Sequence, residues 1–241
     1  VDVADLSWDK AAVSVRGQHE LLTRELLVLV DGRQIFDSLF GGTISGAWPF
    51  QLEDIARIEV IRGPAGVTWG PNAMNGVINI ITKDPADQKG LTVTGGGGNR
   101  GWNKEHIGYA FADKKLRMRV SGEYKGSDGF LKGGSILRSL DDDLKTGRAT
   151  VHGIYDITPN DALTISGGSA ITDGGMPETP LASFLRNKNP HFEANYLMGN
   201  WDHKITEDNR FSIKGFINDA RVEPAADAVD YRYQQFALQF N

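Results

Sequence analysis

The chain has 241 residues, with 26 Lys and Arg against 31 Asp and Glu, and its net charge of -5 argues against a nucleic-acid partner, which would need a basic face. It contains no Cys, so neither a disulfide nor a thiolate metal site stabilises it. Gly is abundant at 29 residues while Pro stays at 9, which indicates many tight turns or small residues against a crowded wall.

The beginning of the sequence shows no targeting segment. Asp2, Asp5 and Asp9 follow residue 1, where a signal peptide would have a basic stretch and an apolar core. No apolar run is long enough for a transmembrane helix.

Short strands separated by Gly and Pro are predicted in the first 90 residues. Leu26 to Val30 is a continuous apolar run that ends at Asp31-Gly32, a typical turn sequence. The further elements expected here are a returning strand over 33–36, a short helical turn over 52–55, an alternating strand over 56–61, a helical turn after Pro64 and a buried, β-branched strand over 77–82.

After Gly90 the pattern becomes long and alternating. Leu116, Met118 and Val120 fall on one face while Arg117 and Arg119 fall on the other, and similar alternation continues to the end of the chain. It predicts about eight strands, each near the ~10-residue length of a membrane-spanning β-strand. In the last strand the apolar parity changes between residues 233 and 236, which predicts a bulge.

The connections between these strands alternate in length. Short turns are expected at 113–114, 158–160 and 206–208, and longer polar loops at 97–103, 126–143, 173–191 and 221–229. Outer-membrane barrels show this rhythm, with short turns in the periplasm and long loops outside. On this half alone, a soluble β-solenoid or sandwich remains the alternative.

Four blocks in order carry a family resemblance. They are Val15-Arg16-Gly17, Leu27 to Arg33, Leu52 to Pro64 and Trp69 to Lys83, and together they resemble the plug domain of TonB-dependent receptors. The resemblance implies a mixed β fold with little helix. Residues 1–88 would form the plug, a small mixed sheet with short helices, and residues 89–241 about eight antiparallel transmembrane strands from the N-terminal part of a twenty-two-stranded barrel.

The same resemblance implies that the chain is truncated at both ends. A signal peptide, the TonB box and the first half of the plug would precede residue 1, and most of the barrel would follow residue 241. An open sheet with two unpaired edges cannot persist in lipid, because each edge leaves backbone groups unsatisfied.

The resemblance also implies site residues. Arg16 and Arg62 would meet glutamates on the barrel wall and hold the plug as a latch; ordinary surface arginines are the alternative. Arg33, Gln34, Phe36, Trp48 and Phe50 would form a substrate-binding plug apex, whose basic and aromatic side chains suit an anionic chelate with aromatic parts. Turn residues with packed aromatics would look the same.

Other motifs are rejected. Residues 96–101 match the G-x-G-x-x-G pattern, but the segment that follows alternates as a strand, so the helix that a dinucleotide site requires is missing. Asp141 to Asp143 lack the Gly and the distal Glu of a calcium loop. The five His are scattered without metal-ligand spacing, and no nucleophile or carboxylate pair stands out. We therefore expect no enzyme, no metal site and no cofactor.

The function that the resemblance implies is that of a receptor in the outer membrane of a Gram-negative bacterium. It would take up a scarce solute with energy delivered by TonB, driven by ExbB and ExbD, and its other partner would be outer-membrane lipid. A ferric siderophore leads among the solutes, while cobalamin, haem and oligosaccharides remain open. The rival functions are a passive plugged porin, a receptor-like signalling protein and a soluble β-rich binding domain.

Overall fold

A computed structural model describes residues 2–5, 11–14, 26–35, 48–69, 72–129, 143–174, 191–207, 209–223 and 231–240. Within these residues the chain forms a two-stranded, a four-stranded and an eight-stranded sheet. The two-stranded sheet pairs β1 (Asp2–Asp5) with β2 (Ala11–Ser14) in antiparallel fashion. We call the four-stranded sheet the small sheet and the eight-stranded one the long sheet.

The small sheet has the strand order β4-β3-β6-β5. Its elements in chain order are β3 (Leu26–Val30), β4 (Arg33–Gln34), the 3-10 turn η1 (Leu52–Asp54), β5 (Ile55–Arg62), the one-turn helix α1 (Gly66–Trp69), β6 (Gly76–Thr82) and the 3-10 turn η2 (Pro85–Gln88). The strands and turns predicted for this region are confirmed except for the returning strand over 33–36, because β4 ends at Gln34 and Phe36 lies outside the described residues. The pairing of β3 with β6 is parallel and the other two pairings are antiparallel, so the sheet is mixed.

The turn between β3 and β4 depends on residues that tolerate a left-handed backbone. Asp31 has φ 50° and Gly32 has φ 77°, the region that Asp and Gly adopt at least cost. The Asp31 carboxylate then accepts hydrogen bonds from the Thr82 N–H and hydroxyl, both at 2.9 Å. These bonds tie the turn to the end of β6, so the position of the turn is set by the sheet.

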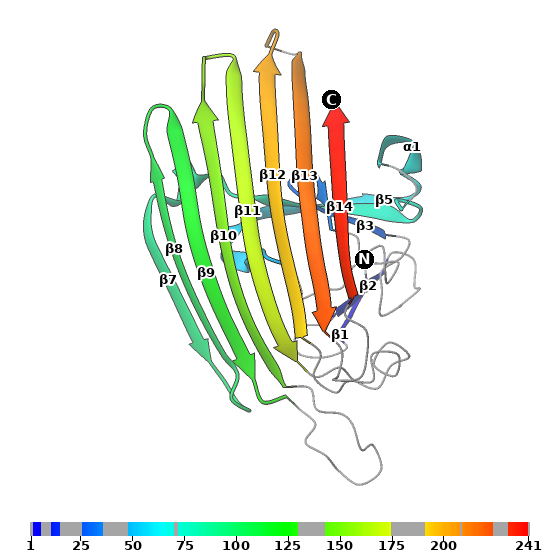
Figure 1. Ribbon diagram of the computed structural model, residues 1–241, viewed down its shortest axis with the longest axis vertical. Helices are drawn as coiled ribbons and strands as arrows, with labels where there is room; N and C mark the ends of the chain where they lie inside the picture. Colours follow the sequence, from blue (N-terminus) through cyan, green and yellow to red (C-terminus); the bar gives the residue numbers. More distant parts are fainter. Residues whose placement is uncertain are drawn as a thin grey trace.

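The long sheet consists of eight antiparallel strands that pair in chain order. They are β7 (Gly90–Gly97), β8 (Asn103–Ala112), β9 (Leu116–Ser127), β10 (Leu144–Asp156), β11 (Asp161–Gly174), β12 (His191–Lys204), β13 (Arg210–Glu223) and β14 (Tyr231–Phe240). Figure 1 shows the short turns β8–β9, β10–β11 and β12–β13 together at the upper end of the sheet. We call this the short-turn end. The number of strands matches the prediction.

The structure tests two local predictions, the rejected glycine motif and the bulge in the last strand. The hairpin over 96–103 joins β7 directly to β8, so the glycine motif leads into a strand. The predicted bulge in the last strand is wrong, because β13 and β14 stay in register from Val222 opposite Tyr231 to Ile213 opposite Phe240. The apolar parity changes for another reason: Tyr233 packs inward against the core, whereas Phe236 is 65% exposed on the outer face.

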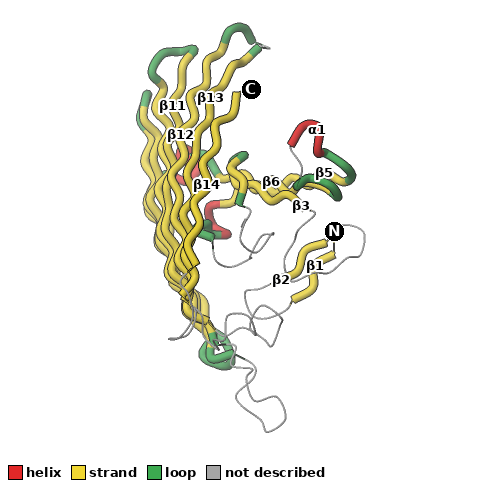
Figure 2. The backbone as a smooth tube through the Cα atoms, turned by 45° about the vertical axis from the view of Figure 1, so that its right-hand side comes forward, coloured by secondary structure: helices red, strands yellow, loops and turns green. Residues whose placement is uncertain are grey.

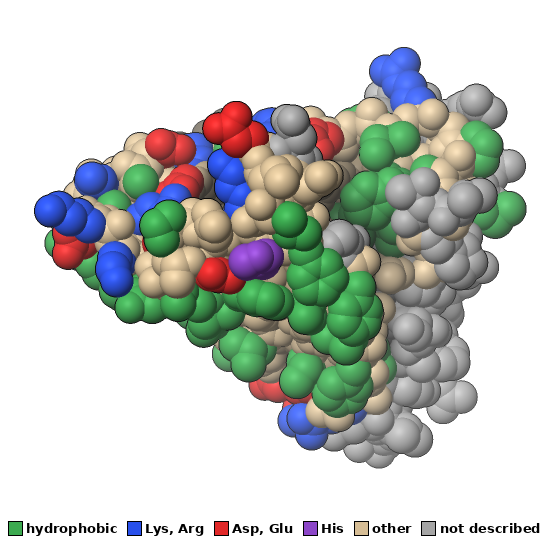
Figure 3. All heavy atoms as spheres, turned by 90° about the horizontal axis from the view of Figure 1, so that it is seen from above, with side chains coloured by type: hydrophobic (Ala, Val, Ile, Leu, Met, Phe, Trp, Pro, Cys, Tyr) green, Lys and Arg blue, Asp and Glu red, His purple; other side chains and the backbone are tan. Residues whose placement is uncertain are grey.

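The long sheet places apolar side chains outward and polar side chains inward. Its exposed large side chains include Leu91, Ile107, Val120, Leu197 and Phe236, whereas its buried polar ones include His106, Arg119, Ser121, His152 and Asn218. Figure 3, which looks onto the short-turn end, shows the apolar side chains gathered along the outer edge of the sheet. A soluble sheet would bury its apolar face, so this inverted arrangement indicates a wall that meets lipid.

Helices contribute little to this architecture. No helix among the described residues is both long enough and apolar enough to cross a membrane.

The small sheet lies against the inner face of the long sheet. Its strands run away from that face and across the direction of the long strands (Figures 1 and 2). The apolar core lies in the small sheet, around Leu26, Val30, Ile78 and Ile80, and it reaches Ala194 of β12. Polar contacts occupy the rest of this junction.

Candidate functional site

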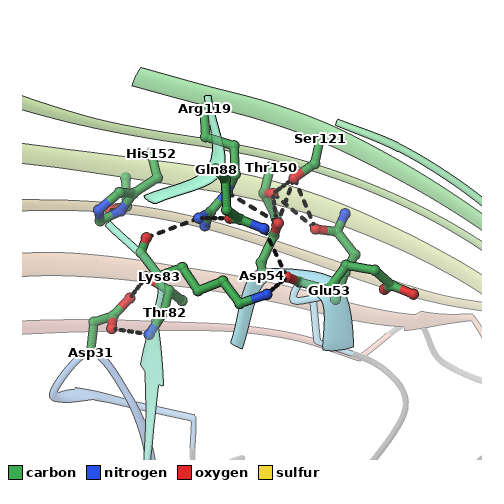
Figure 4. A network of polar contacts seen from close by, with 12 residues as sticks. Asp31, Glu53, Asp54, Thr82, Lys83, Gln88, Arg119, Ser121, Thr150 and His152 are labelled. Carbon is green, nitrogen blue, oxygen red and sulfur yellow. Dashed lines mark hydrogen bonds and ion pairs between the residues drawn. The ribbon is translucent and has the colours of Figure 1, made fainter. Parts of the chain in front are cut away.

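A buried group of polar side chains joins the small sheet to the long sheet (Figure 4). We call it the polar seam; its members are Gln51, Glu53, Asp54, Lys83 and Gln88 on the side of the small sheet and Lys104, Arg119, Ser121, Glu123, Arg148 and Thr150 on the inner face of the long sheet. The turn η1 brings Glu53 and Asp54 to the inner face of the long sheet, because its tight backbone presents these two successive carboxylates.

Asp54 and Arg119 form the centre of the seam. Asp54 is 3% exposed and Arg119 is 4% exposed, and Arg119 Nε lies 3.1 Å from Asp54 Oδ1. The Ser121 hydroxyl lies 2.6 Å from the other carboxylate oxygen. Arg119 Nη1 also donates to the Lys83 carbonyl at 2.9 Å, so one guanidinium contacts two separate segments of the small-sheet unit.

A second charged contact lies next to the first. Lys104 Nζ on β8 is 2.7 Å from Glu53 Oε1 and 3.3 Å from Glu123 Oε2, and Arg148 Nη1 donates to Glu123 at 2.6 Å. Burial opposes ionisation of Glu53, but the hydrogen bond from Lys104 and one from the backbone outweigh it and lower the pKa of Glu53. Charges therefore alternate across the seam.

A third contact lies nearer the short-turn end. Asp84 accepts a hydrogen bond from the Ala86 N–H at 2.8 Å and so caps η2. Its carboxylate also pairs with Arg117 of β9, whose Nη2 lies 3.0 Å from Asp156 of β10. In all three contacts the small-sheet unit supplies the carboxylate, and the long sheet supplies the Lys or Arg side chain that pairs with it. The Asp54–Arg119 pair is the hardest to break by removing one partner, since the partner left behind is a buried charge.

The β3–β4 hairpin makes a different contact with the wall. Arg33 is fully buried; its Nη1 donates to Asn218 Oδ1 at 2.7 Å, and its guanidinium lies 3.8 Å from the Tyr196 ring centre and 5.6 Å from that of Trp48. Burial lowers the pKa of Arg33 to about 10, which still leaves it charged at neutral pH. Lys214 Nζ donates to the Asp31 carbonyl at 2.7 Å. In this contact the small sheet contributes the cation, which packs against the faces of aromatic rings.

The structure places four of the five predicted apex residues at or beside this hairpin contact. Arg33 and Trp48 are brought together and are buried, and Phe50 packs half-buried against the same core. The Gln34 carbonyl accepts from Asn218 Nδ2 at 2.7 Å. Phe36 lies outside the described residues. A substrate-binding role for these residues stays a prediction, and what the geometry shows is contact with the wall.

The two predicted latch arginines have separate outcomes. Arg16 lies outside the described residues. Arg62 is exposed at the end of β5, and no ion pair joins it to another residue that the structure describes. The latch therefore stays a prediction.

The residues of the polar seam were missed in the sequence. A signal was present: Glu53 and Asp54 stand together at a helical turn, and the polar face of β9 carries Arg117 and Arg119. Pairing these two segments requires knowing which strand the small sheet faces, which alternation alone does not provide. Among the described residues, no group of three or more His, Asp or Glu could hold a metal ion.

Comparison with known proteins gives one family match. Residues 3–77 match the family described as the TonB-dependent Receptor Plug Domain. The chain is 33% identical over 122 residues to the vitamin B12 transporter BtuB of Vibrio vulnificus, which covers 50% of this chain and 19% of that protein. It is 41% identical over 85 residues to the iron-regulated outer membrane virulence protein of Vibrio cholerae, which covers 33% of this chain and 13% of that protein.

A solved structure extends the likeness to both sheets. The ferric yersiniabactin uptake receptor FyuA from Yersinia pestis superposes with a TM-score of 0.70 at 16% identity, over 95% of this chain and 39% of that one. At this identity the likeness concerns the fold. The chain spans about a fifth or less of the length of these curated relatives.

Proposed function

We propose that this chain, whose residues 3–77 carry the plug domain of TonB-dependent receptors and whose long sheet has the fold of their barrel wall, works in the energised uptake of a scarce solute. The protein is an outer-membrane protein of a Gram-negative bacterium and not an enzyme, as the similar proteins are named a transporter, an outer membrane protein and an uptake receptor. From here on we call the small-sheet unit the plug and the long sheet the wall.

The observation that carries this proposal is the polar seam. A plug that only filled a barrel would be held best by apolar packing, because replacing buried ion pairs by well-packed apolar groups is often neutral or stabilising. Here the central contact is the Asp54–Arg119 pair, with Glu53 and Lys104 beside it. Close contacts between opposite charges hold the plug at rest and lose their strength once it shifts by a few ångströms. We infer that the seam must open for a solute to pass.

The energy for opening would come from TonB with ExbB and ExbD, through a pull on the plug from the periplasm. In the resting state the plug would close the barrel. The predicted latch of Arg16 and Arg62 would add to the seam, with wall glutamates as their partners. These assignments rest on the plug match and on the seam's position between the plug and the wall.

A ferric siderophore is the solute that we propose first. Of the three similar proteins named above, one is an iron-regulated protein and one takes up ferric yersiniabactin, while the third transports vitamin B12. The predicted apex, Arg33, Gln34, Phe36, Trp48 and Phe50, would contact the solute after the plug shifts, because Arg33 and Trp48 are buried at rest. Cobalamin, haem and oligosaccharides are the alternatives.

Uptake of labelled solutes tests the proposal. The full-length receptor is expressed in cells that lack their other receptors for these solutes, and a panel of ferric siderophores, haem and cobalamin is offered with TonB present or deleted. We expect saturable uptake of one ferric siderophore that disappears without TonB. Uptake that persists without TonB contradicts an energised receptor, and selective uptake of cobalamin or haem would replace the proposed solute.

A further inference from the structure

An open hollow of about 800 Å³ lies at the short-turn end, on strands β9 to β13 and the turns between them. Its floor includes Ala162 and Thr164 of β11, two small side chains that leave the space free. We call it the basic hollow, because five of its lining side chains are Lys or Arg and three are Asp. Outer-membrane barrels keep their short turns in the periplasm, so this end is the exit for a solute that moves inward.

The acidic side chains of the basic hollow already have partners. Asp156 pairs with Arg117 at 3.0 Å, and Asp161 accepts from the Thr158 hydroxyl at 2.6 Å and lies 2.7 Å from His203 Nδ1. Asp202 accepts from the Asn200 side-chain amide. These three carboxylates therefore already have hydrogen-bond or ion-pair partners within the long sheet and its turns.

Four of the basic side chains have no such partner. Lys114, Lys115, Lys204 and Arg210 line the hollow and are exposed, and none of them pairs with a carboxylate of the described residues. Several Lys and Arg side chains are visible at this end in Figure 3. Four cations around one concave surface repel each other and concentrate field lines in the space between them. A bound anion would relieve this repulsion.

The hollow continues inward to the plug. A smaller cavity of about 240 Å³ shares Ile154 and Thr164 with it. It is lined by Asp31 and Asp84, whose carboxylates already bind Thr82 and Arg117, and by two more cations, Lys83 of the plug and Lys214 of the wall. Each of these two donates to a backbone carbonyl, at 2.8 and 2.7 Å respectively. Lysine side chains thus line both spaces, from the plug–wall junction to the short-turn end.

We propose that the basic hollow is an anion-binding site through which a negatively charged solute leaves the receptor for the periplasm. This inference rests on the proposed uptake function and adds the charge of the solute to it. The four unpaired cations at the short-turn end attract an anion away from the plug, and because these side chains are exposed and hydrated, they hold it only weakly. Weak binding at an exit favours release.

A dye-binding measurement tests the site separately from transport. The full-length receptor in detergent is titrated at low ionic strength with pyranine, a trisulfonated pyrene dye, and binding is followed by fluorescence anisotropy. The test variant is Lys204→Gln/Arg210→Gln. The matched control, Lys89→Gln/Lys145→Gln, removes the same charge from two exposed lysines that do not line the hollow. An uncharged dye of similar size serves as the second control.

The expected loss follows from Coulomb attraction. The attraction between one protein charge and one sulfonate at ~7 Å in the dielectric of water changes the affinity by a factor of about 2.7, so the loss of two such charges should weaken pyranine binding by about sevenfold. The control variant should stay within about twofold, and added salt should abolish the difference. Equal affinities of the test and control variants would overturn the anion site.

Uptake then tests the role of the site. The initial rate for the anionic ferric siderophore selected by the panel should fall in the test variant, while binding of that solute from outside stays unchanged. A normal rate despite weakened dye binding would overturn the exit role, as would a panel that selects an uncharged solute. TonB-independent uptake would instead refute the proposed function and leave the dye result standing.

Discussion

Replacement of Asp54 by Ala is predicted to loosen the plug from the wall. Asp54 and Arg119 are each about 5% exposed at the side chain, and their charged atoms lie 3.1 Å apart. At an effective dielectric constant near 20, this distance corresponds to an attraction of about 5 kcal/mol. Desolvation cancels part of this attraction. Removal of one partner still leaves the other as a buried charge without a counter-charge, and this costs about 3–5 kcal/mol of stability.

The assay is urea unfolding of the full-length receptor in detergent, with hydrogen exchange of β6 amides as a local probe of plug docking. Asp54→Ala and Arg119→Ala should each destabilise the docked plug by about 3–5 kcal/mol. The double variant should cost much less than the sum, since neither charge is then left alone. Strictly additive effects, or single losses below about 0.5 kcal/mol, would refute the claim that this pair anchors the plug.

Three further predictions concern the neighbouring contacts. Tyr196→Leu removes the aromatic face that Arg33 stacks on at 3.8 Å, and should reduce stability by about 2 kcal/mol in the urea assay. The lowered pKa of Glu53 means that its contact with Lys104 is fully stabilising above the ordinary Glu pKa of about 4.3; the midpoint of urea unfolding should fall as pH drops through the lowered, folded value. Gly168→Leu should cost about 1–3 kcal/mol, because a Cβ there would lie 2.6 Å from the Tyr196 ring and 3.1 Å from the Ala149 carbonyl oxygen.

Each of these predictions has a control. Tyr196→Phe keeps the ring and should leave most of the stability in place. Glu53→Gln removes the titrating group, so an unchanged pH dependence in this variant would disprove the assignment to Glu53. Gly147→Ala places a Cβ where no atom lies within 4 Å, and it should be near neutral. A loss as large as that of Gly168→Leu would mean that crowding at Gly168 is not the cause.

The positions of the strands were predictable because their signals are local. Alternation marks β9, and Asp31-Gly32 marks the turn after β3 through its need for a positive φ. The parity change in β14 was misread, since a bulge and a switch of contacts give the same pattern in one sequence. Tyr233 turns inward because the core is there, and only the folded arrangement shows this.

The candidate site was less predictable for a physical reason. Asp54 pairs with a residue 65 positions later, and Arg33 meets Asn218 across 185 positions. Such pairings depend on how the plug is oriented against the wall, which follows from the whole interface. The resemblance supplied the two units and their order. The division at residue 88 stays a prediction, because the family match ends at residue 77.

Whether the plug must leave the wall during uptake is tested most directly by a reversible covalent lock. The sequence has no Cys, and a Cβ at Gly168 would lie 3.1 Å from Pro49 Cβ, near the separation of about 3.5–4.5 Å in a disulfide. The variant Pro49→Cys/Gly168→Cys therefore ties plug to wall when oxidised. Our account predicts that TonB-dependent uptake stops in the oxidised receptor and returns on reduction to the rate of the Gly168→Cys single variant, which carries the same crowding against Tyr196. Uptake at an undiminished rate with the disulfide closed would contradict it.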